Sequence, residues 1–329
     1  MVSTSKRLNV RSRRYRSRST SRARPADSLG PSHPLLLRHA RSRALREADL
    51  VIVLGFPFDF RLAYGRKLGR RTRVVAANVS KEELLKNRRP DVAILSKPSV
   101  FLEELAAQAA PTAGLDAWRV SLLARDQERD AEIRAMRDPT AAPLDPIHFL
   151  LSLEEHLEGD AVLIADGGDF VGTASYVLRA RGPRAWLDPG VFGTLGVGGG
   201  FAVGTLAVAP ERPTWILYGD GSCAYSLAEM DTMVRHGLAP IAIVGNDGAW
   251  AQIARDQVAI LGDDVGTRLV RSNYHEVAKG YGAVGLELRE PAAIEDVLNA
   301  AKFERARGNP VVVNVHLRAS TFREGSISL

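Results

Sequence analysis

The sequence predicts an α/β protein built on parallel β-sheets. Short apolar runs rich in β-branched residues alternate along the chain with segments whose apolar residues recur at helical spacing. Strands that alternate with helices in this way are typical of a parallel sheet. The 329 residues are enough for about two domains, and a composition of 45% hydrophobic and 25% charged residues is that of an ordinary globular protein.

The first α/β segment covers about residues 33–110. Its predicted elements are, in chain order, strand 48–55, strand 72–78, helix 81–87, strand 92–95 and helix 99–110. So few strands do not complete a doubly wound sheet, and we interpret the segment as a partial Rossmann-like domain. Residues 111–146 form a helical linker, in which a charged helix at 118–138 is expected to be a solvated connector.

A second α/β segment covers residues 147–329. Strands are predicted at 161–166, 185–188, 214–220, 240–246, 283–288 and 310–317, and helices at 146–158, 170–180, 225–236, 273–281 and 291–307, with a Gly-rich helix after the second strand. Residues 247–272 are expected to be irregular. In an open parallel sheet, ligands gather beyond the carboxyl ends of the strands, and this pattern places Asp166, Asp220 and Asn246 there.

The basic charge of the chain is concentrated near its N-terminus. Residues 1–46 hold 13 Lys or Arg and the single acid Asp27, whereas the remainder holds 31 basic and 37 acidic residues. Residues 1–32 are Arg- and Ser-rich and predict a disordered tail. It is interpreted as a transit-type presequence, as an arm for nucleic acid or another acidic surface, or, as we favour, as residues outside the natural domain. Nothing else in the chain is basic or suitably aromatic, so nucleic acid is not expected as the main partner.

Cysteine content and hydropathy exclude several classes of protein. The single cysteine, Cys223, excludes an internal disulfide and a cysteine-based zinc site. No apolar run of suitable length follows the basic start, so no secretory signal is expected and the predicted location is the cytoplasm. The uncharged segment 189–210 contains seven glycines, which argues against a membrane-spanning helix.

Two predicted strand ends carry residues that indicate chemistry. Asp220 lies between Gly219 and Gly221, and 24 residues separate Gly221 from Asn246 at the end of the next strand. A carboxylate and an amide oxygen at one sheet edge suit a hard divalent cation such as Mg²⁺. The glycines let the backbone approach an anion, and a helix beginning near Ser222 would direct N–H groups toward it. The pattern therefore predicts a metal-bridged diphosphate site.

These residues resemble the signature of thiamine-diphosphate-dependent enzymes, in which GDG is followed at similar spacing by Asn. The stretches DGGDFVGTASYVLRARGPRAWLDPGVFGTLGVG, FDFRLAYGR, SNYHEVAKGYGA and TFREGSISL resemble the acetolactate synthase-like branch, which includes 2-hydroxyacyl-CoA lyases of the second type. The resemblance covers about His33 to Leu329. It implies a C-terminal pyrophosphate-binding domain at 147–329, preceded by a partial middle domain at 33–110.

The resemblance also implies roles for single residues. The metal ligands would be Asp220, Asn246 and the backbone carbonyl of Gly248. The carbonyl of Gly193 would accept a hydrogen bond from the aminopyrimidine of the cofactor, and Leu195 would be an apolar wedge beneath it. Further cofactor contacts are expected from Gly219, Gly221, Ser222, Ala249 and Trp250.

The activity implied by the resemblance is that of a C–C lyase or synthase with thiamine diphosphate and Mg²⁺. The lyase would cleave a 2-hydroxyacyl-CoA to an aldehyde and formyl-CoA, and the synthase would use pyruvate and a second 2-keto acid; the sequence does not separate the two. In the family an N-terminal pyrimidine domain supplies an activating glutamate, which this chain does not have, so we expect a truncated chain. The alternative is a catalytically inactive half-site that needs a partner chain. A homo-oligomer is expected because relatives pair subunits to complete the site.

Several other residues are open as site candidates. Cys223 is interpreted as a packing residue and His275 as a structural one. Asp166 and Asp169 either face the cofactor and substrate or cap helices. Segment 55–66 lies where relatives touch FAD or an adenine nucleotide, but no nucleotide is predicted because the first part of that domain is missing. Weaker candidates for lining or closing the pocket are Gln252, Phe322 and Arg323.

Overall fold

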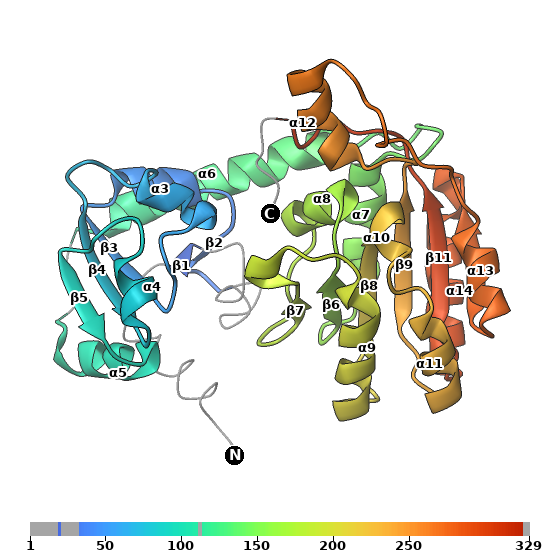
Figure 1. Cartoon of the computed structure of the whole chain (residues 1–329), viewed down its shortest axis with the longest axis horizontal. Helices are drawn as coiled ribbons and strands as arrows, with labels where there is room; N and C mark the ends of the chain where they lie inside the picture. Colours follow the sequence, from blue (N-terminus) through green and yellow to red (C-terminus); the bar gives the residue numbers. More distant parts are fainter. Residues whose placement is uncertain (1–18, 21–32, 111–113, 325–329) are drawn as a thin grey trace. The chain divides into compact units, whose positions relative to one another are not determined.

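The computed structural model describes residues 19–20, 33–110 and 114–324 and consists of two compact units (Figure 1). Of the described residues, the first unit contains 19–20, 33–110 and 114–129, and the second contains 130–324. The tail predicted at 1–32 lies outside the described residues except for Ser19–Thr20. These two residues form strand β1, which pairs in parallel with β2 (Leu36–Leu37).

The sheet of the first unit has three parallel strands in the order β3-β4-β5. The elements are α3 (Arg41–Glu47), β3 (Leu50–Leu54), β4 (Arg73–Asn78), α4 (Lys81–Leu85), β5 (Val92–Leu95) and α5 (Pro98–Gln108). All except α3 were predicted from the sequence. The 3-10 segment Phe60–Gly65 contains Ala63 and Tyr64 with φ angles of 49° and 56°, a left-handed conformation that is unfavourable for residues with a Cβ.

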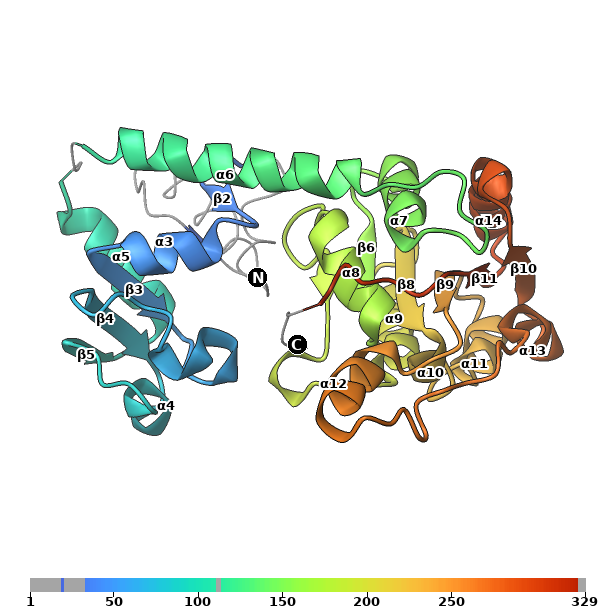
Figure 2. The ribbon, with the colours of Figure 1, turned by 90° about the horizontal axis from the view of Figure 1, so that it is seen from above.

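Helix α6 (Asp116–Ala135) is continuous (Figure 2) and confirms the helix predicted in the linker. The prediction that this helix is a solvated connector was wrong for the part of α6 that lies in the first unit. Leu122 is fully buried beside Leu37. The Asp126 carboxylate accepts backbone N–H hydrogen bonds from Arg38, His39 and Ala40 at 2.6, 2.9 and 2.6 Å, so this part of α6 fixes the start of α3.

The sheet of the second unit has six parallel strands in the order β10-β11-β9-β8-β6-β7. They are β6 (Val162–Ala165), β7 (Trp186–Leu187), β8 (Thr214–Gly219), β9 (Ile241–Asn246), β10 (Val284–Leu288) and β11 (Val311–His316). Each strand lies within its predicted range. The predicted parallel α/β architecture is therefore confirmed.

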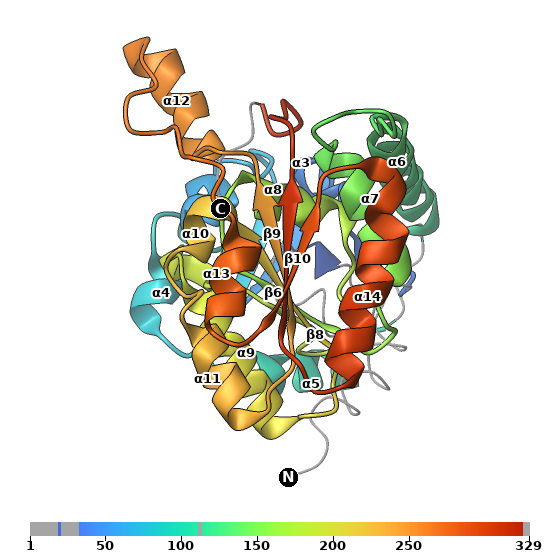
Figure 3. The same ribbon diagram turned by 90° about the vertical axis from the view of Figure 1, so that its right-hand side faces the viewer.

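Helices cover both faces of this sheet (Figure 3). They are α7 (Pro146–His156), α8 (Asp169–Val177), α9 (Val197–Val208), α10 (Asp220–Cys223), α11 (Glu229–His236), α12 (Ala251–Leu261), α13 (Tyr274–Gly280) and α14 (Ile294–Ala306). On β8, Trp215 faces the core formed with α7, α8 and α14, whereas Ile216 faces the core formed with α9, α11 and α13. Burial on both faces explains why the strands are almost continuously apolar.

Two parts of the second unit differ from the prediction. Helix α12 occupies a stretch expected to be irregular and extends beyond the carboxyl edge of the sheet (Figure 1). It has no fully buried residue, although Ala251, Ala254, Val258 and Leu261 recur at helical spacing, so the sequence carried a helical pattern that the prediction missed. The helix predicted at 225–236 begins only at Glu229, because α10 has formed at the strand end before it. No helix in the described ranges is both long and apolar enough to cross a membrane.

Helix α9 packs closely on β8 through Gly198. A Cβ at Gly198 would lie 2.7 Å from a ring carbon of Tyr218 and 2.8 Å from Ile216 Cγ2, whereas a Cβ at Gly204 of the same helix would meet no atom within 4 Å. We expect Gly198→Ala to lower the free energy of unfolding by about 1–3 kcal/mol through overpacking. The matched Gly204→Ala should raise it by about 0.5–1 kcal/mol, because Ala favours helix over Gly. Urea unfolding followed by circular dichroism measures both, and equal stabilities would contradict this packing.

Candidate functional site

Three neighbouring strands deliver polar side chains to one edge of the second sheet. Asp166 directly follows β6, Asp220 directly follows β8, and Asn246 is the last residue of β9. In the sheet, β8 lies between β6 and β9. These residues are 3%, 2% and 0% exposed, respectively, so all three are buried polar groups whose partners must be identified.

The Asp220 carboxylate ties the two strand ends together. Its Oδ1 accepts a hydrogen bond from the N–H of Gly221 at 2.8 Å, and its Oδ2 accepts one from the N–H of Gly248 at 2.8 Å. Burial raises the pKa of Asp220, and these backbone hydrogen bonds act in the opposite direction. A cation beside this carboxylate would favour its ionised form.

Only the nitrogen of the Asn246 side-chain amide makes hydrogen bonds within the part of the chain that the structure describes. Its Nδ2 donates to the carbonyl of Ser272 at 3.1 Å and to Oδ1 of Asn314 at 3.1 Å. Its Oδ1 is buried and has no hydrogen-bond partner among the described residues. An unsatisfied amide oxygen in a buried position is a group that a cation would satisfy.

The loop after β9 carries the third predicted metal ligand. Gly248 has a φ of +74°, which favours glycine, and its carbonyl already accepts a hydrogen bond from the N–H of Leu269 at 2.8 Å. One lone pair of that carbonyl remains for another partner. Asp247 beside it has its pKa raised to about 7 by burial and by the charge of Asp220. Its Oδ1 accepts the N–H of Ala249 at 3.2 Å.

Cysteine and histidine do not take part in this candidate metal site. Among the described residues, no group of three or more His, Cys, Asp or Glu side chains is arranged to hold a metal ion. The candidate ligands are instead one carboxylate, one amide oxygen and one carbonyl. This oxygen set is suited to a hard cation that keeps water or phosphate oxygens as further ligands.

Asp166 is a helix cap. Its Oδ1 accepts the N–H of Gly196 at 2.9 Å and its Oδ2 accepts the N–H of Gly198 at 2.6 Å, at the start of α9. Burial raises its pKa, and the same hydrogen bonds lower it. Of the two interpretations left open for Asp166, the structure supports capping.

The residues expected to grip the aminopyrimidine follow the 3-10 turn Gly190–Phe192. Gly193 has a φ of +56°, and the turn places Leu195 directly against Gly167, where no Cβ would fit. Gly167 and Gly168 follow Asp166 at the end of β6. Leu195 therefore lies at the same strand end as Asp166.

The residues expected at the diphosphate surround the start of α10. The Ser222 hydroxyl lies 2.9 Å from the carbonyl of Gly167 and 3.1 Å from that of Gly219, so its proton is used within the protein. Its backbone N–H, in the first turn of α10, is then the better candidate for an anion. The Trp250 ring packs on Gly221, where it fills the position of a Cβ.

Sequence reasoning missed three residues near this edge. Arg255 on α12 forms a 2.5 Å ion pair with Asp169, the first residue of α8. Arg271 donates to the carbonyls of Asn246 at 2.6 Å and Leu317 at 2.7 Å, which links the ends of β9 and β11. Ser272 contributes only its carbonyl. These residues lie in the stretch expected to be irregular or at its end, and no periodic pattern marks the positions of Arg271 and Ser272.

The other candidates have structural surroundings. Cys223 is fully buried and burial raises its thiol pKa, as for a packing residue. His275 is buried on α13, and its Nδ1 lies 3.3 Å from Asn314 Nδ2. Phe322 packs edge-on against Tyr176 at 5.4 Å between ring centroids. Arg323 is buried against Gly172 of α8.

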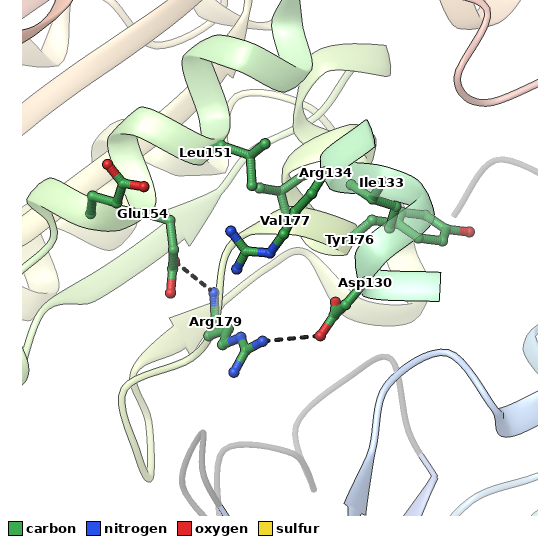
Figure 4. A pocket seen from close by; sticks show the side chains of 9 residues that line it. Asp130, Ile133, Arg134, Leu151, Glu154, Tyr176, Val177 and Arg179 are labelled. Carbon is green, nitrogen blue, oxygen red and sulfur yellow. Dashed lines mark hydrogen bonds and ion pairs between the residues drawn. The ribbon is translucent and has the colours of Figure 1, made fainter. Parts of the chain in front are cut away.

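A cavity of about 250 Å³ lies between the end of α6, α7 and α8 (Figure 4). Arg179 lies at its edge, where its side chain is 3.0 Å from Asp130 and its backbone N–H is 3.1 Å from Glu154. The lining residues are Asp130, Ile133, Arg134, Leu151, Glu154, Glu155, Tyr176, Val177 and Arg179. None of them is a predicted metal or cofactor residue, so this cavity is separate from the candidate site.

Comparison with known proteins gives two matching family models. The C-terminal TPP-binding domain of thiamine pyrophosphate enzymes matches residues 166–315, and the central domain of these enzymes matches residues 18–105. The first match begins at Asp166 and includes Asp220 and Asn246. The second begins within the segment predicted as a tail.

Three relatives illustrate the similarity. 2-Hydroxyacyl-CoA lyase 2 from Danio rerio is 44% identical over 308 residues, which cover 92% of this chain and 50% of the relative. The protein of the same name from Homo sapiens is 40% identical over 308 residues, with 92% and 49% covered. The acetolactate synthase large subunit from Mycobacterium tuberculosis is 35% identical over 296 residues, with 88% and 52% covered. The chain thus spans about half the length of the curated relatives it matches.

We expect Asp247→Asn to stabilise the metal-free protein, and to do so more strongly at pH 8 than at pH 5. The pKa of Asp247 rises from 3.8 to about 7 on folding, so the folded protein holds this proton more tightly. The free energy of unfolding therefore falls as the pH rises through this range. Asparagine does not ionise and avoids this loss, so the gain in the free energy of unfolding should be about 2–3 kcal/mol larger at pH 8 than at pH 5.

Urea unfolding in EDTA at the two pH values measures this difference. Asp256→Asn, which changes an exposed aspartate on α12, is the matched control and should behave as the parent at both pH values. A benefit of Asp247→Asn that is equal at pH 5 and pH 8 would contradict the raised pKa.

Proposed function

This chain belongs to the thiamine pyrophosphate enzyme family, in its acetolactate synthase-like branch, and from that membership we propose that its second unit binds thiamine diphosphate through Mg²⁺ at the carboxyl ends of β8 and β9. The ligands in this proposal are Oδ of Asp220, Oδ1 of Asn246 and the carbonyl of Gly248. The family accounts for the cofactor, and the geometry of the site supports the cation.

The buried side-chain oxygen of Asn246 is the observation that carries the proposal. No described residue donates a hydrogen bond to it. Leaving such a group unsatisfied costs about 1–3 kcal/mol, and a bound cation would remove that cost. Asp220, at the end of the neighbouring strand, is a carboxylate whose burial raises its pKa, and a cation would favour its charged form as well. Both oxygens are hard ligands of the kind Mg²⁺ prefers.

The remaining contacts are proposed from their places around the same edge. Leu195 and the carbonyl of Gly193 would orient the aminopyrimidine. The diphosphate would lie against the backbone of Gly219, Gly221 and Ser222 at the start of α10. The N–H groups of Gly219 and Gly221 already donate to the Gly167 carbonyl and the Asp220 carboxylate, so the N–H of Ser222 is the candidate donor to the anion. Ala249 and Trp250 would complete the wall on the side of the β9 loop.

When bound, thiamine diphosphate supplies the ability to stabilise the negative charge that a carbon atom gains when a C–C bond beside it is made or broken. We propose a C–C lyase or synthase with a 2-hydroxyacyl-CoA or a 2-keto acid as the substrate. The names of the relatives, 2-hydroxyacyl-CoA lyase and acetolactate synthase, support these two classes. In either case, the residues of this chain position the cofactor and exclude water from it.

The relatives carry about as much chain again as the part matched here. We propose that a pyrimidine domain, on the same polypeptide or on another, completes the site and supplies the activating acid. The second candidate function is a cofactor-binding half-site that does not turn over by itself. We also propose that the protein is located in the cytoplasm and assembles as a homo-oligomer.

Removal of the carboxylate ligand tests the cation site. We expect Asp220→Ala to weaken Mg²⁺-dependent binding of thiamine diphosphate by about 100-fold or more, because a direct ligand and its charge are lost. Isothermal titration calorimetry measures the affinity, and far-UV circular dichroism checks the fold. Asp231→Ala, which removes a carboxylate that is 51% exposed on α11, is the control and should bind as the parent does. Unchanged binding by Asp220→Ala would contradict the assignment.

Turnover distinguishes the candidate functions. The chain, once shown to bind cofactor, is assayed with a 2-hydroxyacyl-CoA for release of formyl-CoA and with pyruvate for release of CO₂. Activity on one substrate assigns the lyase or the synthase, and binding without either activity supports the half-site. Turnover by the chain alone would rule out the half-site.

A further inference from the structure

Asn314 is a polar residue inside an otherwise apolar central strand. It lies in β11 between Val313 and Val315, is 0% exposed, and pairs in register with Val244 of β9. Val244 lies two residues before Asn246, so Asn314 and Asn246 are on the same face of the sheet. A buried amide among valines is unfavourable unless its hydrogen bonds are made, so its partners indicate why it is there.

One backbone carbonyl determines the orientation of two amide groups. The carbonyl of Ser272 accepts from Nδ2 of Asn246 at 3.1 Å and from Nδ2 of Asn314 at 3.1 Å. A carbonyl can only accept, so each asparagine must turn its NH₂ group toward it. Asn314 then directs its Oδ1 at Asn246 Nδ2, 3.1 Å away, and occupies the second N–H of that group.

The same arrangement continues to His275 on α13. Nδ2 of Asn314 lies 3.3 Å from His275 Nδ1. Since this amide nitrogen is a donor, Nδ1 must be the acceptor, and a neutral His275 carries its proton on Nε2. Nε2 lies 3.4 Å from a carboxylate oxygen of Glu276, which favours a proton there. Each side-chain donor in the series thus faces an acceptor.

Both N–H groups of Asn246 are occupied in this arrangement, and its Oδ1 is turned away from every described donor. A rotation of the Asn246 amide by 180° would place Oδ1 against the Ser272 carbonyl and the Asn314 oxygen, which are both acceptors. The repulsion would disfavour the rotated form. The orientation of the free oxygen therefore depends on Asn314 as well as on Ser272.

We propose that Asn314 is a positioning residue for the cation site: with the Ser272 carbonyl, it holds the Asn246 amide in the one orientation that presents Oδ1 to the metal. The inference rests on the proposed function, because it assigns Asn246 as a ligand. Partners that orient a metal ligand affect metal affinity by about 10- to 100-fold when they are removed.

Two substitutions at residue 314 and one nearby control test the proposal. Asn314→Leu keeps the branched shape of the side chain and removes the acceptor, so Mg²⁺-dependent affinity for thiamine diphosphate should fall about 10- to 100-fold. Asn314→Asp keeps an oxygen that accepts from Asn246 but replaces the donor to the Ser272 carbonyl and His275 with a second acceptor, so its affinity should fall as well. Val312→Ala, on the same strand and the same face, should lower stability by about 1–3 kcal/mol but change the affinity less than about 2-fold.

Calorimetry with Mg²⁺ and thiamine diphosphate, and the EPR spectrum of Mn²⁺ in the same site, provide the readouts, with urea unfolding for stability. Asn314→Leu should also alter the Mn²⁺ spectrum, whereas Val312→Ala should not, because only the former releases a ligand. Equal losses of affinity in Asn314→Leu and Val312→Ala would assign Asn314 a structural role only and overturn the proposal.

A measurement on the parent protein avoids dependence on the folding of a variant. Nitrogen-15 NMR of the histidine side chains should show neutral His275 protonated at Nε2, and a proton at Nδ1 would overturn the hydrogen-bond arrangement. If the parent binds cofactor and Asn314→Leu binds equally well, this inference alone fails. If the parent binds no thiamine diphosphate with Mg²⁺, the proposed function fails and this inference fails with it.

Discussion

The parallel pairing of β8 with β9 is the constraint on which the candidate site depends. The register places Gly219 opposite Gly245, so that Asp220 and Asn246 follow at the same level of the sheet. Alternation of side chains then puts both on the face covered by α9, α11 and α13. A slip of one residue would turn one of them to the opposite face. The apolar residues that fill both faces of these strands, such as Trp215 and Ile216, therefore position the polar site as well as form the core.

The same edge concentrates groups that are unfavourable to bury. Burial raises the pKa of Asp166, Asp220 and Asp247, and the oxygen of Asn246 has no partner among the residues that the structure describes. The cost of burying the Asp166 carboxylate is offset within the protein, because the carboxylate accepts two backbone hydrogen bonds at the start of α9. The hydrogen bonds of Asp220 and Asn246 offset only part of the cost of burying these side chains. A bound cation would offset more of that cost. The well-packed sheet beneath provides the stability that such an edge requires.

Much of the fold and part of the site could be predicted from the sequence. The strands of the second unit were recognised because burial on both faces makes them continuously apolar. Asp220 and Asn246 were recognised because they end two such runs. The contribution of Asn314 could not be predicted, since a single polar residue does not break the pattern of a strand and its partners come from distant segments. The role of Asp166 depends on Gly196, 30 residues away, and only the folded chain shows which of its two interpretations is correct. Helix α12 could have been predicted, because its apolar residues Ala251, Ala254, Val258 and Leu261 recur at helical spacing. Arg271 and Ser272 lie outside any helix or strand, and their contacts follow no period that a sequence pattern could display.

Helix α12 differs from the other long helices of the second unit in that it has no fully buried residue. Its described link to the candidate site is the ion pair between Arg255 and Asp169, and Ile253, Ile260 and Leu261 remain exposed. Because the sheet does not rely on this helix for packing, insertions, deletions and exchanges of its outer residues would be tolerated by the core. Related domains could therefore evolve different binding preferences at α12 while the residues at the strand ends stay the same.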